Sequence, residues 1–214
     1  MGHFIKVVLD RIVAALVLAV TSPLFALAAV AILLEDGRPV FFRQTRPGYK
    51  GRPFVIVKFR TMNNDCDYSG TPQSDEVRLT RVGRILRRLS LDEFPQFWNV
   101  LRGDMSIVGP RPLMMQYLKR YSTEQARRHD VLPGITGWAQ INGRNAVSWE
   151  EKFRLDVWYV DHQSFLLDLR ILATTIWRVL KQEGISQQGH ATMPEFLGTG
   201  QSELNSDSRQ SGTA

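Results

Sequence analysis

The longest feature of the hydrophobic pattern is an apolar run near the N-terminus. Residues 12–34 read IVAALVLAVTSPLFALAAVAILL, with no charged side chain. About 18 or more consecutive apolar residues suffice for burial in a bilayer. The run also exceeds the apolar part of a secretory signal peptide, about 7 to 15 residues, although Ala26-Leu27-Ala28 resembles a cleavage site. We therefore predict a membrane-bound protein.

A Ser22-Pro23 pair lies near the centre of this run. Proline has no amide hydrogen and clashes with the carbonyl four residues earlier, so a helix kinks or breaks here. Each half alone is too short to cross a hydrocarbon layer of about 30 Å. Basic side chains flank both ends, so charge favours neither orientation. The residues alone fit a helix that dips into the membrane and returns, and equally a kinked spanning helix.

Shorter patterns predict a small β-hairpin followed by helices. Residues 39–42 and 53–59 are β-prone and flank the turn-rich segment 46–52, so they predict a hairpin. Apolar residues at helical spacing predict a helix over 79–89. Further helices are expected at about 95–102, 112–129, 149–161 and 167–182.

Two later segments have a less usual composition. The helix expected at 167–182 combines a heavy apolar load with Arg170, Arg178 and Lys181, which fits a position in the lipid headgroups as well as one in the core. From about Gly189 onward the chain is polar, and we expect no stable structure there because it cannot bury enough apolar surface.

The charge of the chain narrows its partners without identifying them. Lys and Arg number 27 against 21 Asp and Glu, a formal net charge of +6, which favours phosphates, nucleotides, anionic lipid or nucleic acid. The single cysteine, Cys66, excludes an intramolecular disulfide framework. The sequence contains no GxxxxGK[ST], GxSxG or GxGxxG string, so the commonest nucleotide-binding and acyl-transfer motifs do not explain its chemistry.

Two adjacent acids, Asp92 and Glu93, follow an arginine-rich stretch. Ser90 and Glu93 have the spacing of a capping box. Pro95 argues against Ser90 as the cap, whereas a helix that starts at Asp92 or later keeps Pro95 in the tolerated first turn. A partly desolvated, ionised Asp beside phosphate-binding cations can act as a nucleophile or hold Mg2+. Taken alone, such a pair is more often structural or solvated.

Five strings together carry a family resemblance. In order along the chain they are KFRTM (58–62), SLDE (90–93), GDMSIVGPRP (103–112), PGITGWAQ (133–140) and NGRN (142–145). They resemble the motifs of the bacterial sugar transferase family, the monotopic phosphoglycosyl transferases, and the likeness covers about residues 3–185. Because the chain lacks the added domains of some relatives, it resembles the small, core-only type.

The resemblance implies a transferase that moves a sugar 1-phosphate from a UDP-sugar to a polyprenyl phosphate such as undecaprenyl phosphate and releases UMP. Asp92 would attack the β-phosphate and form a covalent phosphosugar intermediate. Glu93 would be its partner, and both acids would help to hold Mg2+. The family's re-entrant helix breaks at a Ser-Pro pair, matched here by Ser22 and Pro23, which favours the dip-and-return topology.

The resemblance also suggests which side chains bind the substrate. Attack by a carboxylate on a diphosphate needs cations to neutralise charge. Arg144 and Asp156 match family positions at the nucleotide-sugar end of the site, although a salt bridge between them is nearly as well supported. Trp138 is expected either to stack on a base or to pack. The substrate-binding candidates are Lys58, Arg60, Arg87, Arg111, Trp138, Arg144 and Asp156.

We therefore expect an α+β, mainly helical fold. Residues 1–36 would form a re-entrant membrane helix, 37–188 a catalytic domain with amphipathic interfacial helices and a small β-hairpin, and 189–214 a disordered tail. The resemblance implies a bacterial inner (cytoplasmic) membrane location with the catalytic domain on the cytoplasmic face. The expected partners are a UDP-sugar, polyprenyl phosphate and anionic membrane lipid, but no nucleic acid. A homodimer is left open.

Two other classes compete with this interpretation. A non-enzymatic, membrane-anchored basic protein that binds anionic lipid or nucleic acid would explain the +6 charge but leave Asp92 and Glu93 without a role. A transporter or polytopic transferase is disfavoured by the single long apolar run.

Overall fold

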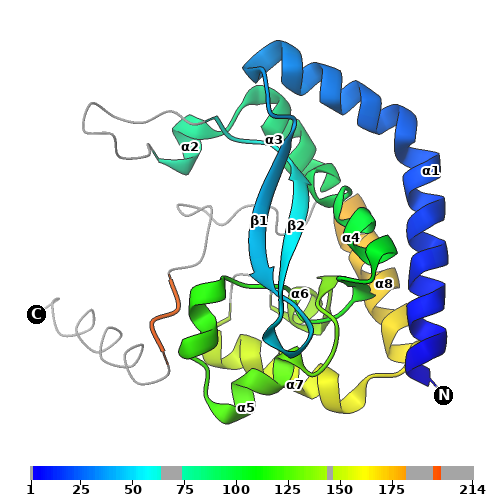
Figure 1. Ribbon diagram of the computed structural model, residues 1–214, viewed down its shortest axis with the longest axis vertical. Coiled ribbons are helices and arrows are strands. Elements are labelled where there is room, and N and C mark those ends of the chain that lie inside the picture. Colours follow the sequence, from blue (N-terminus) through cyan, green and yellow to red (C-terminus); the bar gives the residue numbers. More distant parts are fainter. Residues whose placement is uncertain (1, 64–73, 144–146, 182–194, 199–214) are drawn as a thin grey trace, which may run out of the picture.

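The computed structural model describes residues 2–63, 74–143, 147–181 and 195–198, arranged as in Figure 1. The fold is mainly helical with a small two-stranded hairpin, as the sequence predicts. Its α-helices are α1 (Gly2–Asp36), α2 (Asp75–Arg78), α3 (Arg81–Arg88), α4 (Gln96–Arg102), α5 (Thr123–Ala126), α6 (Trp138–Asn142), α7 (Trp149–His162) and α8 (Phe165–Leu180). Its strands are β1 (Phe41–Pro47), β2 (Pro53–Phe59), β3 (Ser106–Val108) and β4 (Gly134–Thr136).

The apolar run forms one long helix, α1, which bends near its middle (Figure 1). Pro23 lies inside the helix and cannot donate to the carbonyl of Ala19. The Ser22 hydroxyl donates to that same carbonyl oxygen at 2.8 Å, and the Thr21 hydroxyl donates to Val17 at 2.6 Å. Because these side chains replace part of the lost hydrogen bonding, the helix bends at the Ser-Pro pair without ending there.

Most of α1 is left uncovered by the rest of the protein. Among the described residues it is the one helix long and apolar enough to cross a membrane, and only 11% of its most apolar window is buried. Ala14, Ala28 and Ile32 are the hydrophobic residues of α1 that the rest of the protein buries, and the Phe25 ring also packs on Phe59. The uncovered apolar surface supports membrane association.

Polar contacts fix the N-terminal half of α1 to the domain. Lys6 lies 2.6 Å from the Asp168 carboxylate, on the first turn of α8, and 3.4 Å from Asp10. The Ser106 hydroxyl, in β3, donates to Asp10 at 2.5 Å. These half-buried contacts hold an otherwise apolar helix in one orientation on the domain.

The predicted hairpin is confirmed, with β1 beginning two residues later than the β-prone run. The strands pair antiparallel, with Phe41 opposite Phe59 and Gln44 opposite Ile56. The buried Asn99 side chain of α4 bonds to the backbone of β2, donating to Val55 O at 2.7 Å and accepting from Val57 N at 3.2 Å. This amide fixes the hairpin against α4.

A second, parallel pair of short strands was not predicted. Ser106 of β3 pairs with Gly134 of β4, and Val108 pairs with Thr136. A Cβ on Gly134 would lie 2.1 Å from the Gly109 nitrogen, so only glycine allows the two backbones to approach this closely. The contact places the GPRP turn beside the PGITGW segment.

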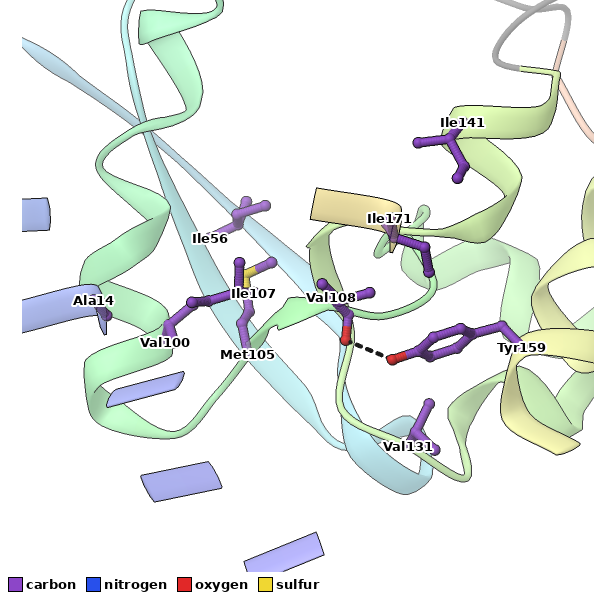
Figure 2. Packing of buried hydrophobic residues seen from close by; sticks show 10 residues of the cluster. All are labelled: Ala14, Ile56, Val100, Met105, Ile107, Val108, Val131, Ile141, Tyr159 and Ile171. Atoms are coloured by element: carbon purple, nitrogen blue, oxygen red, sulfur yellow. Dashed lines mark hydrogen bonds between the residues drawn. The ribbon is translucent and has the colours of Figure 1, made fainter. Parts of the chain in front are cut away.

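The main core lies between α1, the hairpin, the parallel strands and helices α6 to α8 (Figure 2). Val100, Met105, Val108 and Ile171 are at most 1% exposed. The buried Tyr159 hydroxyl lies 3.1 Å from the Val108 carbonyl, the dashed line in Figure 2, and 2.7 Å from Asp168. The core therefore satisfies its phenol without solvent.

The helix expected over 112–129 is wrong as a single element. The chain instead forms a 3-10 turn at Met115–Lys119, the short helix α5, and another 3-10 turn at Arg127–His129. Ser122 and Gln125 form a capping box that starts α5 afresh. This local cap divides the segment into separate short turns, so residues 112–129 do not form one continuous helix.

The expectation of an unstructured tail does not hold at residues 195–198. Phe196 is fully buried in a cluster with Tyr117 and Phe153. The Phe196 ring contributes to this docking because an aromatic side chain buries a large apolar area. The rest of the predicted tail lies outside the described residues.

Candidate active site

The two adjacent acids lie in a tight turn directly before α4. Ser90 has a left-handed backbone, with φ 55° and ψ 22°, and its side chain caps nothing. Leu91–Glu93 form one 3-10 turn, and Pro95 is the N-cap of α4. The prediction that Ser90 is not the cap, and that Pro95 lies at the start of the helix, is confirmed.

Glu93 is held by two cations from distant parts of the chain. Lys58, in β2, donates to Glu93 Oε1 at 2.7 Å. Arg111, in the GPRP turn, binds both carboxylate oxygens, a bidentate contact that fixes orientation as well as charge. Burial acts to raise the pKa of Glu93, but Arg111 and Lys58 outweigh it and hold the pKa well below its usual range. Glu93 is therefore a permanent anion.

Asp92 differs from its neighbour. Within the described part of the chain, its carboxylate makes no hydrogen bond or ion pair. Burial and the negative charge of Glu93 raise the pKa of Asp92 to about 6, against the opposing effect of Lys58, Arg87 and Arg111. Both oxygens of Glu93 are thus bound by cations, whereas the Asp92 carboxylate is unbound by any described residue but lies near positive charge.

Arg87 is aimed by a neighbour that the sequence did not single out. Its Nε donates to the Thr61 hydroxyl at 3.0 Å, and Thr61 is nearly buried. The helix α3 that carries Arg87 approaches the Thr61 backbone so closely that a Cβ on Gly83 would lie 2.1 Å from the Thr61 carbonyl. Thr61 belongs to the KFRTM string, and this membership was the one feature of the sequence that could have identified it as a site residue.

The Asp156 carboxylate, a predicted substrate-binding group, is buried and paired with Arg128. The residue is 2% exposed, and its carboxylate accepts from Arg128 Nε at 3.0 Å and Nη2 at 2.7 Å. Arg128 also donates to the backbone carbonyl of Arg111 at 2.8 Å. The ion pair therefore supports the segment that presents Arg111. No motif in the sequence pointed to Arg128, because its role depends on contacts that form only in the folded protein.

Two other predicted substrate residues, Arg60 and Trp138, contact other parts of the chain. The Arg60 guanidinium binds the carbonyls of Asp36 at 2.6 Å and Gly37 at 2.7 Å, so it ties down the end of α1. The Trp138 ring stacks on Trp158 with centroids 4.7 Å apart, which is the packing alternative. Arg144 lies outside the described residues, so its predicted salt bridge with Asp156 is not seen.

Two further cations lie within electrostatic reach of Arg111. Burial and Arg111 lower the pKa of Arg46, whose Nε has no hydrogen-bond partner among the described residues. Burial, together with Arg111 and Arg128, lowers the pKa of Lys152 to about 8. These two groups extend the positive charge next to Arg111, which suits a polyanionic substrate.

The residues present fit Mg2+ only as a site shared with substrate. No cluster of three or more His, Cys, Asp or Glu occurs in the parts of the chain described. The oxygens of Asp92 are uncommitted, whereas Glu93 Oε1 is occupied by Lys58 and Arg111. Mg2+ commonly binds one or two carboxylates and completes its shell with water and phosphate oxygens, which this donor set allows.

The chain is similar to known proteins over most of its length. Residues 1–182 match the family described as bacterial sugar transferase. The chain is 55% identical over 196 residues to an uncharacterised sugar transferase, EpsL, of Bacillus subtilis, with 92% of this chain and 97% of the relative covered.

Two further relatives have names that state an activity. A UDP-glucose:undecaprenyl-phosphate glucose-1-phosphate transferase of Caulobacter vibrioides is 46% identical, with 80% of this chain and 68% of the relative covered. A Xanthomonas campestris protein of the same name is 42% identical, with 83% and 39% covered, so the chain spans well under half of that relative.

The buried Arg128–Asp156 pair yields a stability prediction. Asp156→Asn keeps the shape but leaves Arg128 buried without a counter-charge, so we expect the free energy of unfolding to fall by about 3 kcal/mol. Asp161→Asn is the matched control. Asp161 lies on the same helix as Asp156 but forms an exposed ion pair with Arg127, so its loss should lower the free energy of unfolding by less than about 1 kcal/mol. Chemical denaturation in detergent micelles measures both. Equal losses would contradict the supporting role of Arg128.

Proposed function

Because the chain belongs to the bacterial sugar transferase family, we propose that it transfers a sugar 1-phosphate from a UDP-sugar to undecaprenyl phosphate through an aspartyl intermediate. It is a phosphoglycosyl transferase, an enzyme that transfers a sugar phosphate to undecaprenyl phosphate. The UDP-sugar donor, the covalent intermediate and the first membrane step of a surface-glycan pathway are the finer parts of the proposal. The family membership disfavours a non-enzymatic basic protein.

The observation that carries the proposal is the contrast between the two acids. Lys58 and Arg111 saturate Glu93, while the Asp92 carboxylate has no hydrogen bond or ion pair among the described residues. A nucleophile must offer a lone pair to an incoming phosphorus atom, and a carboxylate already bound by two cations does so poorly. Asp92 is therefore the nucleophile, and Glu93 anchors the cations around it.

The first step forms one bond and breaks another. An Asp92 carboxylate oxygen attacks the β-phosphorus of the UDP-sugar, and the bond from that phosphorus to the bridging oxygen breaks. The bridging oxygen leaves with the electron pair as part of UMP. The product is a mixed anhydride between Asp92 and the sugar phosphate. Arg87 and Arg111 stabilise the negative charge that accumulates on the phosphate oxygens.

The second step restores the enzyme. A phosphate oxygen of undecaprenyl phosphate attacks the same phosphorus, and the bond to Asp92 breaks with its electrons returning to the carboxylate. The product is undecaprenyl diphosphate sugar. Mg2+ bound by Asp92 together with phosphate oxygens of the substrate would supply further neutralisation of the diphosphate charge. The same cations serve both steps because the reacting centre is a phosphoryl group each time.

The location of the reaction follows from the uncovered apolar surface. The long side chains of α1 and the exposed Phe165, Leu166, Trp177 and Leu180 of α8 are available for lipid contact. Ile171 of α8 is buried, so this helix has one core face and one apolar outer face. We propose a re-entrant α1, anionic lipid at the basic flanks, and a catalytic domain on the cytoplasmic face of the inner membrane. The homodimer stays a prediction.

The covalent step is tested by intact mass without a lipid acceptor. Detergent-solubilised protein, Mg2+ and a panel including UDP-glucose and UDP-N-acetylgalactosamine should give a sugar-phosphate adduct and one equivalent of UMP. Asp92→Asn should abolish both, because an amide oxygen cannot form the anhydride. Asp104→Asn serves as a matched acid control outside the proposed site. EDTA should suppress UMP release, and full activity without divalent metal would remove Mg2+ from the proposal.

If Asp92→Asn still formed the adduct, another residue would be the nucleophile. If no donor gave an adduct but UMP appeared only after undecaprenyl phosphate was added, transfer would be direct rather than covalent. No release under any condition would contradict the proposed donor class.

The raised pKa of Asp92 predicts an acid limb in the pH profile. Only the carboxylate attacks, so the rate of UMP release should fall as the pH decreases through about 6. Replacing Glu93 with Gln removes a neighbouring negative charge and should move this limb to lower pH, in addition to slowing the reaction. Stopped assays between pH 5 and 8 at fixed metal concentration measure the limb. A flat profile in the wild type would contradict it.

The proposed membrane topology depends on the bend in α1. Pro23→Leu restores the amide donor to Ala19 and removes the clash, so we expect a straighter helix with a fraction of molecules spanning the membrane. Accessibility of single cysteines placed at both ends of the chain, on a Cys66→Ser background, measures the topology. Both ends on one side in the wild type are expected, and opposite sides would overturn the re-entrant arrangement.

A further inference from the structure

A short segment near the C-terminus docks into the catalytic domain. Residues 195–198 lie at the edge of the domain, on the side away from α1 in the view of Figure 1, where they are drawn in orange. Phe196 is 0% exposed, whereas its neighbour Leu197 is 45% exposed. One side chain of the segment is therefore inserted, and the next points outward.

The pocket that receives Phe196 is built from aromatic rings. Its ring lies 4.9 Å from Phe153, 5.7 Å from Tyr117, 5.8 Å from Trp149 and 6.0 Å from Tyr121, measured between centroids. The Phe153 and Tyr117 contacts are edge-to-face, and the Tyr121 contact is stacked. These are favourable aromatic geometries, each adding to the apolar area buried.

Polar groups fix the backbone of the same segment. The Phe196 amide donates to the Tyr117 hydroxyl at 3.2 Å, and Arg120 donates to the Phe196 carbonyl. Arg120 and Gln116 both bind Glu195, at 2.7 Å and 2.6 Å. An acidic residue followed by phenylalanine is thus recognised by charge, by ring packing and by main-chain hydrogen bonds.

The pocket is continuous with the segment that carries Arg111. Leu113, two residues after Arg111, packs against the same aromatic cluster. Arg128 lies over the rings of Tyr121 and Phe153, at 5.8 Å and 5.6 Å from their centroids, and donates to the Tyr121 hydroxyl at 3.2 Å. Arg128 in turn holds the Arg111 carbonyl at 2.8 Å. Phe196 therefore packs on the groups that position Arg111.

We propose that Phe196 is a positioning residue for the transfer reaction: docked in the aromatic pocket that Leu113 and Arg128 connect to Arg111, it keeps the Arg111 guanidinium aligned with Glu93 and the substrate phosphate. The inference rests on the proposed function. Phe196 touches neither substrate nor reacting atoms, and it acts through Tyr121, Phe153 and Arg128. Without its ring, the pocket is left partly empty and the support of the GPRP turn loosens.

The test uses the full-length chain and the single-turnover rate of adduct formation. Phe196→Ala should lower this rate at least about tenfold, because a small displacement of a charge-stabilising group is costly in a preorganised site. Leu197→Ala, in the same segment but outward-facing, should react like the wild type. Phe196→Leu should recover part of the rate, since it refills much of the pocket. The thermal midpoint of each variant is recorded in parallel.

A peptide supplied in trans separates positioning from general damage to the fold. A peptide of residues 192–200 should bind the Phe196→Ala protein and restore the rate, whereas the same peptide with Ala in place of Phe should not. Arg120→Ala provides a second variant that leaves the aromatic core intact, and it should slow adduct formation several-fold. Wild-type rates in both Phe196→Ala and Arg120→Ala would overturn the proposal, as would peptide binding without any recovery of rate.

Failure of this inference is distinguishable from failure of the proposed function. Binding of a fluorescently labelled peptide to the Phe196→Ala protein is measured by anisotropy and needs no catalysis. If the wild type forms no adduct while the peptide binds, the proposed function fails and the docking stands. If the wild type forms adduct and Phe196→Ala matches it, the positioning role alone is wrong.

Discussion

The carboxylate of Glu93 is the interaction on which the site depends. It draws Lys58 from the hairpin and Arg111 from the GPRP turn to the start of α4. Without this anion, two half-buried cations would repel each other across a small space. With it, they stay together and lie beside Asp92. The acid that performs no bond-making step in our proposal therefore organises the acid that does.

Two of the cations around the acids are positioned by residues outside the site. Thr61 orients Arg87, and Arg128 holds the backbone of Arg111. Arg128 is nearly inaccessible to solvent, and Asp156 compensates its charge. Such layering is physically necessary, because a phosphate-binding site needs several positive charges close together and each must be fixed against repulsion.

The membrane helix is part of the same construction. Arg60 binds the end of α1, while Lys6 and Asp10 fix its beginning to α8 and β3. The bend at Pro23 lies between these two attachments, so the apolar surface of α1 has a defined relation to the catalytic domain. The proposed reaction requires such a relation, since in it the phosphate of a lipid acceptor has to reach the group held by Asp92 from the membrane.

The sequence by itself determined the long apolar helix, the hairpin, most helices and the pair Asp92 and Glu93, because each depends on local periodicity, a proline position or a short motif. Tertiary structure alone decided which charges meet. In the folded protein Arg60 binds the end of α1, and Asp156 is buried against Arg128. Phe196, which belongs to a polar stretch of the sequence, is buried in an aromatic pocket. These outcomes depend on contacts between residues far apart in the chain, and no local pattern encodes the partner of a charged or aromatic side chain.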